Sequence, residues 1–166
     1  YSPLHYREER EDLVHEIIQK FNFATLISVT PEGPIISHLP MIMDASKKVL
    51  LSHCARANPH WKHFNNGQIV TIVFSGPHSY ISPAWYQPHP DNVPTWNYVV
   101  VHVQGKVRII EDSNECWNLM NKLVNHYEKM YSTRWSLSDT PNETLKNDIQ
   151  RGNTVFEISM DKIESK

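Results

Sequence analysis

Residues Trp96–Ile110 read WNYVVVHVQGKVRII, a long run dominated by β-branched residues. Such residues favour a strand, because their branched side chains fit the pleated surface of a sheet. Gly105 interrupts the run, and a glycine inside a strand is typical of a bulge or a bend. A strand that bends in its middle lets a sheet curl on itself. This stretch therefore predicts a small β-barrel.

Further β-rich runs lie on both sides of this strand. Four of them come before it and are separated by short turn sequences, which predicts a meander of four strands. A last strand is expected close to the C-terminus. The expected strands are Phe23–Thr30, Pro34–Met43, Lys48–His53, Gln68–Gly76 and Asn153–Met160.

Helices are expected before and after the main β region. Residues Arg7–Phe21 carry Leu13, Ile17 and Phe21 at helical spacing, with Val14 and Ile18 beside them. Asp112 or Ser113 can cap a second helix, whose apolar face would hold Trp117, Met120, Leu123, Val124 and Tyr127. The polar stretch Ser132–Asp148, broken by Pro141, predicts a loop plus a short helix.

These elements predict a mainly β fold, a β-barrel with added helices. The chain has 166 residues and no internal repeat or flexible linker, so a single domain over residues 1–166 is expected.

The charge balance narrows the function classes. Sixteen Lys and Arg against eighteen Asp and Glu leave a net charge of −2, so nothing draws the whole chain to nucleic acid or to an anionic membrane. No apolar run approaches the roughly 18–20 residues that cross a bilayer, and the first residues lack a signal-peptide core. A cytoplasmic protein without a membrane partner is expected. Cys54 and Cys116 lack CxxC spacing, which argues against a disulfide framework and a thiolate zinc site.

An anion site is suggested by Ser52–Phe64, which reads SHCARANPHWKHF. Asn58 followed by Pro59 is typical of a helix start, so a helix over residues 59–64 is expected. Helix N-termini attract anions, and Arg56 and Lys62 would add two positive charges for a phosphate. A capped surface helix with two solvated cations is the alternative interpretation.

A second candidate region is Gly76–Tyr98, which contains five prolines and is expected not to be helical. Its aromatic residues would form a stiff wall suited to a planar ring, with Ser79, Ser82, Thr95 and Asn97 as hydrogen-bonding groups. A loop that seals a barrel end or makes a dimer contact is equally open. The aromatic residues are Tyr80, Trp85, Tyr86, Trp96 and Tyr98.

The ten histidines do not form a recognisable metal site. His60 and His63 lie one turn apart with His53 upstream, but no carboxylate or cysteine completes a ligand set, so no metal is expected. His38 and His102 fall in apolar strand patterns and are expected as core or pocket histidines. Haem stays open, with His38, His53 or His102 as possible ligands.

Four segments together closely resemble the PaiB-type family of FMN-binding split-barrel proteins. They are SHLP at Ser37–Pro40, HCARANPHWK at His53–Lys62, GPHSYISPAWY at Gly76–Tyr86 and VPTWNYVVVHVQGKV at Val93–Val107. The family is related to pyridoxamine-phosphate oxidase, and its members are commonly labelled negative transcriptional regulators. The resemblance covers almost the whole chain. It implies a six-stranded Greek-key split barrel that forms a homodimer with FMN at the dimer interface.

The resemblance also implies a set of site residues. Arg56, Asn58 and Lys62 would hold the FMN phosphate, with Trp61 packed nearby. His38, Leu39, Pro40, Ser52 and His53 would border the flavin ring. Tyr80 and Ser82, together with Thr95, Trp96 and Asn97, would come from the other subunit. Family members usually continue into a Lys-Leu-Ser-Gln-Asn-type tail, which is expected to be missing here because the sequence stops at KIESK.

The leading functional interpretation is an FMN-binding homodimer, either an FMN-dependent oxidoreductase or a flavin sensor. No substrate base is evident, and no second cluster of cations supports the oxidation of a phosphorylated pyridoxal. A transcriptional repressor that acts on DNA or on a partner protein without catalysis is one alternative. The net charge and the lack of a helix-turn-helix pattern or basic stripe speak against direct DNA binding. A haem-binding split barrel is the other alternative.

Overall fold

Six antiparallel strands close into a barrel, as expected. The computed structural model describes residues 3–64, 67–131, 133–139 and 143–166. Around the barrel the strands run in the order β4-β1-β2-β3-β6-β5, and a pairing between β4 and β5 closes the ring. Their bounds are β1 (Phe23–Thr30), β2 (Gly33–Asp44), β3 (Val49–Ala55), β4 (Ile69–Ile81), β5 (Thr95–Ile109) and β6 (Asn153–Ser159).

Two strand predictions were wrong. The first four strands do not form a meander, because β4 pairs with β1 whereas β3 pairs with β6. This connection from β3 across to the far side of β1 makes the topology a Greek key rather than a meander. The polar end of the chain also forms a seventh strand, β7 (Lys162–Ser165), which pairs with residues Val101–Gln104 of β5. Its charged residues hid the strand from a search for apolar alternation.

Gly105 lies where β5 changes partner from β7 to β6. Residues 101–104 pair with β7 and residues 107–109 pair with β6, so two strands share one edge of β5. A Cβ atom on Gly105 would lie 1.5 Å from the carbonyl oxygen of Ser159, the last residue of β6. The backbones can approach this closely only at a glycine. The register of β5 with β4 runs through Gly105 unbroken, and the irregularity lies instead between Ser75 and His78.

The barrel interior forms one apolar core, which α1 covers. The helix spans Glu11–Lys20, shorter than the expected Arg7–Phe21. Val14 and Ile18 of the predicted apolar face are buried, and Ile17 packs against the core beside them. Larger members of this core are Leu26, Met41, Ile72, Phe74 and Phe156.

A second core lies outside the barrel, where α2 (Ser113–Met130) packs against β3 and β6. Asp112 caps this helix, because its carboxylate accepts bonds from the backbone N–H groups of Asn114 and Glu115 at 3.0 and 2.8 Å. All five predicted residues of the helix face contact this core. The short helix expected after it is α3 (Glu143–Gly152), whereas the predicted break at Pro141 lies outside the described residues. Short 3-10 helices occur at Leu4–Tyr6 (η1) and Leu137–Asp139 (η4).

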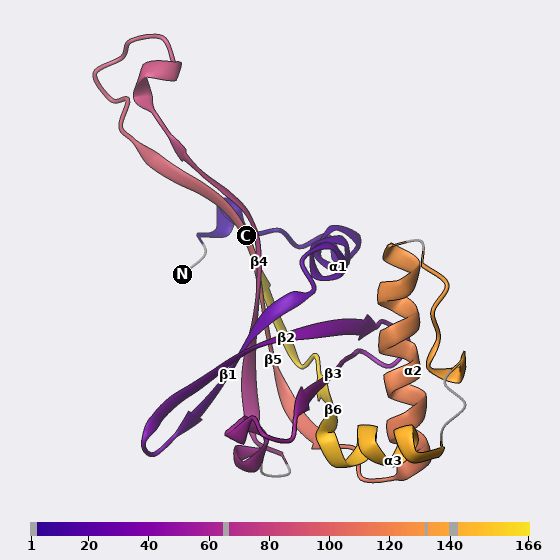
Figure 1. Ribbon diagram of the computed structural model, residues 1–166. Helices are drawn as coiled ribbons and strands as arrows, with labels where there is room; N and C mark the ends of the chain where they lie inside the picture. Colours follow the sequence, from indigo (N-terminus) through magenta and orange to yellow (C-terminus); the bar gives the residue numbers. More distant parts are fainter. Residues whose placement is uncertain (1–2, 65–66, 132, 140–142) are drawn as a thin grey trace.

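Beyond the barrel, β4 and β5 continue together as a projecting arm (Figure 1). Their pairing runs on through His78 with Tyr98 to Ile81 with Thr95. The flanks of the proline-rich segment therefore extend β4 and β5 away from the barrel, so the segment does not seal a barrel end as a loop. The prediction that it cannot be helical was wrong at one point, since Pro83–Trp85 forms a 3-10 turn, η3.

At the other end of the barrel, η2 (Pro59–His63) packs against β1 and β2. The helix begins at the expected Asn58–Pro59 step, and the Asn58 side chain accepts a bond from the His60 N–H at 3.0 Å. However, η2 is a single 3-10 turn and not the expected α-helix. Such a short segment has little aligned dipole, so its N-terminus alone is a poor anion site.

His60 anchors η2 to the barrel. Its ring is fully buried, and Nδ1 and Nε2 each lie 2.8 Å from a serine hydroxyl, that of Ser37 on β2 and that of Ser28 on β1. Burial lowers the pKa of His60 to about 4, with the nearby His63 as a smaller cause. His60 is therefore neutral at physiological pH, and neither ring nitrogen is left for a metal.

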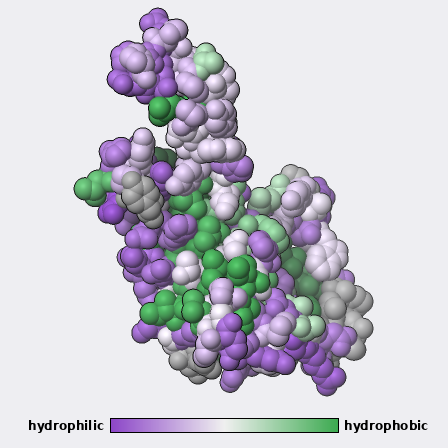
Figure 2. All heavy atoms as spheres, turned by 90° about the vertical axis from the view of Figure 1, so that its left-hand side faces the viewer, coloured by the Kyte–Doolittle hydropathy of each residue, from purple (hydrophilic) through white to green (hydrophobic). Residues whose placement is uncertain are grey.

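The outer face of β1, β2 and β4 is apolar and lies away from the helices. We call Phe23, Ile27, Val29, Ile36, Ile69 and Val73 the outer apolar face. The strand registers place these side chains on one surface, because Ile27 pairs with both Ile36 and Thr71. Phe23, Val29 and Ile69 are 68%, 73% and 63% exposed. Figure 2 shows apolar residues gathered on this side of the barrel. No helix among the described residues is long and apolar enough to cross a membrane.

We expect Gly105→Ala to lower the free energy of unfolding by about 3 kcal/mol or more, because the added methyl would overlap a backbone carbonyl that cannot rotate away. Urea unfolding followed by circular dichroism measures this loss. Gly152→Ala is the matched control, since no atom lies within 4 Å of a Cβ at that position. Its stability should stay within about 1 kcal/mol of the parent. Equal stability of the two variants would show that β5 and β6 do not approach as described.

We also expect the protein to lose stability as the pH falls from about 6.5 to about 4, since unfolded histidine takes up a proton in this range whereas folded His60 does not. The loss should reach up to about 3 kcal/mol and then level off below the folded pKa. The measurement is urea unfolding across this pH range. His60→Gln should flatten the profile relative to the parent, and His89→Gln, on the exposed arm, should leave it unchanged. An unaltered slope in His60→Gln would contradict the assignment.

Candidate cofactor site

Arg56 follows β3 directly and is held from three directions. Its backbone N–H donates to the Gly152 carbonyl at 2.7 Å, and its Nη1 donates to the buried Thr154 hydroxyl at 3.1 Å. The guanidinium carbon lies 4.5 Å from the ring centroid of Trp61. Among the described residues no carboxylate forms an ion pair with Arg56. The guanidinium is thus fixed in place with most of its donors available to an anion.

Trp61 supports Arg56 twice. Its indole N–H donates to the Arg56 carbonyl at 2.8 Å, and its ring lies under the guanidinium. The half-buried Trp61 ring also packs against the barrel core, so the support is rigid. Lys62 is the next residue of η2 and is exposed. The structure therefore brings all four residues predicted around the phosphate, Arg56, Trp61, Lys62 and Asn58, to one end of the barrel.

Asn58, the fourth, uses its side chain internally. Its amide oxygen accepts from the His60 N–H at 3.0 Å, and its amide nitrogen donates to the Ser37 hydroxyl at 3.0 Å. Because both groups of its amide are engaged, Asn58 has a structural role: it fixes the turn that carries Arg56.

The residues predicted to border the ring divide between core and surface. Leu39 and Ser52 point into the barrel, and the Ser52 hydroxyl donates to the Pro40 carbonyl at 2.7 Å. Only their backbones can face a ligand outside. Pro40 lies where β2 leaves β1 and joins β3, because it pairs with Phe23 whereas the next residue pairs with Ser52.

His53 is the polar group in this set without a partner. Burial lowers its pKa, and among the described residues nothing bonds to its buried Nδ1 atom. Buried polar atoms are nearly always paired, so an orphaned ring nitrogen near the end of β3, the strand that leads to Arg56, fits a site that takes a ligand.

The expectation that His38 and His102 are core or pocket histidines was wrong for His38. Its side chain is exposed on the outer side of β2 and stacks with Phe23 at a centroid distance of 6.5 Å. His102 is half-buried on β5, opposite Val73 of β4 and Glu164 of β7. Both lie on the same outer side of the sheet, where strand alternation could not tell an apolar exposed face from a core face. Among the described residues, no three His, Cys, Asp or Glu side chains are gathered so as to hold a metal.

The five remaining predicted residues lie on the arm. Trp96 is 59% exposed, and its ring meets that of Tyr80 edge-on with centroids 6.0 Å apart. Ser82 caps η3 by accepting from the Ala84 N–H, while Thr95 and Asn97 pair with Ile81 and Ser79 across the arm.

The arm and the Arg56 turn lie at opposite ends of the barrel within one molecule. η2 lies at the end where β4 begins, and the arm lies where β4 finishes (Figure 1). The 13 residues of β4 span about 40 Å at the usual rise of a strand. A single mononucleotide therefore cannot touch both predicted groups within one subunit.

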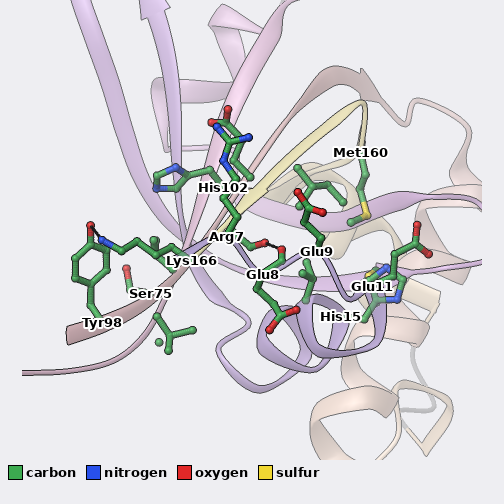
Figure 3. Close-up of a pocket in the computed structure, with 18 of the residues that line it drawn as sticks. Arg7, Glu8, Glu9, Glu11, His15, Ser75, Tyr98, His102, Met160 and Lys166 are labelled. Atoms are coloured by element: carbon green, nitrogen blue, oxygen red, sulfur yellow. Dashed lines mark hydrogen bonds between the residues drawn. The ribbon is translucent and has the colours of Figure 1, made fainter. Parts of the chain in front are cut away.

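A groove of about 1180 Å³ lies at the base of the arm (Figure 3). Its walls come from α1 and the segment before it, from β4 and β5, and from the chain after β6, and they include Arg7, His15, Tyr98, His102, Met160 and Lys166. Lys166 crosses it, with its ammonium 3.0 Å from the Tyr98 hydroxyl. Of the fourteen residues predicted for the cofactor site, Trp96 alone lines this groove. Sequence spacing gave no sign of the groove, because its walls come from both ends of the chain.

Sequence reasoning also missed the residues that support the Arg56 turn. Thr154 and Gly152 reach it from the β6 region, and Ser28 reaches His60 from β1. Small hydroxyl residues in apolar strands carry no local signal of such a part. Only the pairing of β3 with β6 reveals Thr154, which is 98 residues away from Arg56.

Comparisons with known proteins agree with this architecture. The family model described as "Putative FMN-binding domain" matches residues 1–162. "Protease synthase and sporulation protein PAI 2" of Bacillus subtilis is 29% identical over 167 residues, which cover 99% of this chain and 79% of that protein.

Two solved structures show the same fold. The flavocytochrome Anf3 from Azotobacter vinelandii aligns with a TM-score of 0.73 at 12% identity, over 100% of this chain and 72% of that one. A protein of the pyridoxinephosphate oxidase family from Clostridium acetobutylicum aligns with a TM-score of 0.57 at 11% identity, over 93% and 86%. At such identities the likeness concerns the split-barrel fold alone. The family match covers nearly all of the sequence, so this chain belongs to that family of FMN-binding domains, and FMN is the cofactor that the family assigns to it.

Proposed function

We propose that this protein is a flavin-dependent homodimer in which the FMN phosphate binds Arg56 of one subunit and the arm of the other subunit covers the ring. The observation that carries the proposal is the Arg56 guanidinium, held by Trp61 and Thr154 with no carboxylate partner among the described residues. A guanidinium in that state is prepared for a bidentate contact with a phosphate.

The phosphate seat consists of Arg56 and Lys62. Arg56 lies just before η2 and the exposed Lys62 lies within it, so both charges are carried at the same end of the barrel. Two cations match a phosphate that carries close to two negative charges. Asn58 serves the seat through the turn that it caps rather than through its own amide, because both groups of that amide are engaged.

The flavin ring would lie on the outer side of β2 and reach the His53 end of β3, because α2 covers the outer side of β3 at Val49 and Leu51. Leu39 and Ser52 offer backbone groups there, whereas His38, Pro40 and His53 offer side chains. The unpaired Nδ1 of His53 would gain a hydrogen-bond partner from a polar edge of the ring.

A second copy of the chain completes the site. The outer apolar face is too continuous for a surface that stays in water, and such faces mark interaction sites. A two-fold dimer through this face would bring the arm of each subunit toward the Arg56 turn of its partner. Tyr80, Ser82, Thr95, Trp96 and Asn97 would then contact a flavin that their own subunit cannot reach.

FMN, when bound, supplies hydride or electron transfer. The protein would anchor the phosphate, exclude water from the ring with the aromatic arm and hold hydrogen-bonding groups at the ring edge. This division of labour suits an FMN-dependent oxidoreductase or a cytoplasmic flavin sensor. Regulation of transcription would follow from flavin state rather than from direct DNA binding, since the chain carries a net charge of −2.

We expect Arg56→Ala to weaken FMN binding about 10- to 100-fold, because one charge-assisted phosphate contact is worth about 1.5–3 kcal/mol. Titration of FMN with the protein, followed by flavin fluorescence, gives the dissociation constant. Arg134→Ala removes an exposed arginine outside the seat and should leave the affinity unchanged. If Arg56→Ala bound FMN as tightly as Arg134→Ala, the phosphate would have to lie elsewhere.

Mixed dimers test whether two subunits build each site. Arg56→Ala and Trp96→Ala homodimers should both bind FMN poorly. If each site takes Arg56 from one subunit and Trp96 from the other, random exchange at equal amounts makes about half of the dimers mixed, and each mixed dimer has one intact site.

About a quarter of all sites should therefore recover parental affinity after mixing. The measurement is the amount of FMN retained at a concentration that only intact sites bind. A site built within one subunit would recover nothing, because every subunit in the mixture carries one defect.

A further inference from the structure

We propose that His60 is a positioning residue for the phosphate seat, which it controls from the barrel interior by fixing Trp61 beneath Arg56. This inference rests on the proposed function, since it assigns a second layer of residues to the same seat. His60 itself is fully buried and cannot touch a ligand.

A continuous chain of hydrogen bonds joins β1 to the Arg56 turn. It runs from Ser28 to His60, from His60 to Ser37, and from Ser37 to Asn58, with donor–acceptor distances of 2.8, 2.8 and 3.0 Å. Ser28 and Ser37 belong to two paired strands, so this chain of hydrogen bonds ties η2 to both β1 and β2.

Each of these hydrogen bonds can be given one donor and one acceptor. All three bonds are satisfied when Asn58 donates to the Ser37 hydroxyl, that hydroxyl donates to Nδ1 of His60, and Nε2–H of His60 donates to the Ser28 hydroxyl. A neutral imidazole is the side chain that can accept at one nitrogen and donate at the other. This explains a histidine at a position where burial alone would favour an apolar residue.

Trp61 connects His60 to Arg56. Trp61 is the adjacent residue of η2, so a shift of the His60 ring moves Trp61 with it. Trp61 in turn fixes Arg56 at two points, its carbonyl oxygen and its guanidinium face. On the other side, the Phe64 ring packs on His60 with centroids 5.2 Å apart and ties the end of η2 to the core.

A displaced Arg56 should weaken binding of the phosphate more than binding of the flavin ring. A bidentate contact between guanidinium and phosphate depends on atomic placement to within a fraction of an ångström, whereas ring stacking tolerates small shifts. Loss of the Ser28–His60–Ser37 chain should therefore reduce the advantage of FMN over riboflavin, which lacks the phosphate, more than it reduces binding of the ring.

The experiment measures the dissociation constants of FMN and riboflavin for the same chain and divides the riboflavin constant by the FMN constant, so that a lower ratio means a smaller advantage of FMN. Ser37→Ala should lower the ratio about fivefold to tenfold, with riboflavin affinity changed less than about twofold, because a lost buried hydrogen bond displaces the seat but not the ring pocket. Ser37→Thr keeps the hydroxyl and should restore the ratio. Ser28→Ala removes the bond on the other side of the ring and should act in the same direction. Ser46→Ala, on an exposed turn, is the control.

A double variant tests the route through Arg56. If Ser37 acts on the phosphate only by placing Arg56, then Ser37→Ala should change nothing further once Arg56 is alanine. Equal losses of FMN and riboflavin affinity in both serine variants would overturn the inference, because they would indicate a general structural defect. A full additional loss in the double variant would overturn it as well.

The Arg56→Ala variant separates this inference from the proposed function. If Arg56→Ala itself leaves the ratio of the two affinities unchanged, the seat is wrongly placed and the proposed function fails. If Arg56→Ala lowers the ratio while Ser37→Ala and Ser28→Ala do not, the seat stands and only the part assigned to His60 fails.

Discussion

The close approach of Gly105 to the Ser159 carbonyl is the constraint on which the molecule depends. At this point one edge of β5 changes its pairing from β7 to β6, while the other edge remains paired with β4. The exchange closes the barrel below Gly105 and leaves β4 and β5 free to continue beyond it as the arm. One contact between two backbones thus helps to place the arm and the Arg56 turn at opposite ends of the barrel.

That separation explains why the predicted site looks incomplete in one subunit. Arg56, Trp61 and Lys62 gather at one end, whereas Trp96 and Tyr80 extend from the other end with their rings in solvent. Exposed aromatic side chains on the arm and an exposed apolar sheet face are each unfavourable in water, and the Arg56 guanidinium has no carboxylate partner among the described residues. A two-fold pairing of chains would resolve all three at once, because it brings complementary groups together.

Local sequence predicted most elements because their signals are local. Alternation and β-branched residues located six strands, and the Asn58–Pro59 step located the start of η2. The signals failed where tertiary contacts decide. β7 is polar because its residues lie at a barrel edge, and His38 sits among apolar residues that face outward. The placement of β4 beside β1 depends on a long-range pairing that no turn sequence specifies.

The sequence by itself determined the fold class, the family and the short segments from which a cofactor site would be built, because these follow from patterns within a few neighbouring residues. Only the tertiary structure decided how the segments combine. It showed that the Asn58 side chain makes its hydrogen bonds within the turn and that Thr154 and Trp61 support Arg56. It also showed that His60 ties this turn to β1 and β2. These contacts join residues up to 98 positions apart, and strand pairing is the physical cause that brings them together.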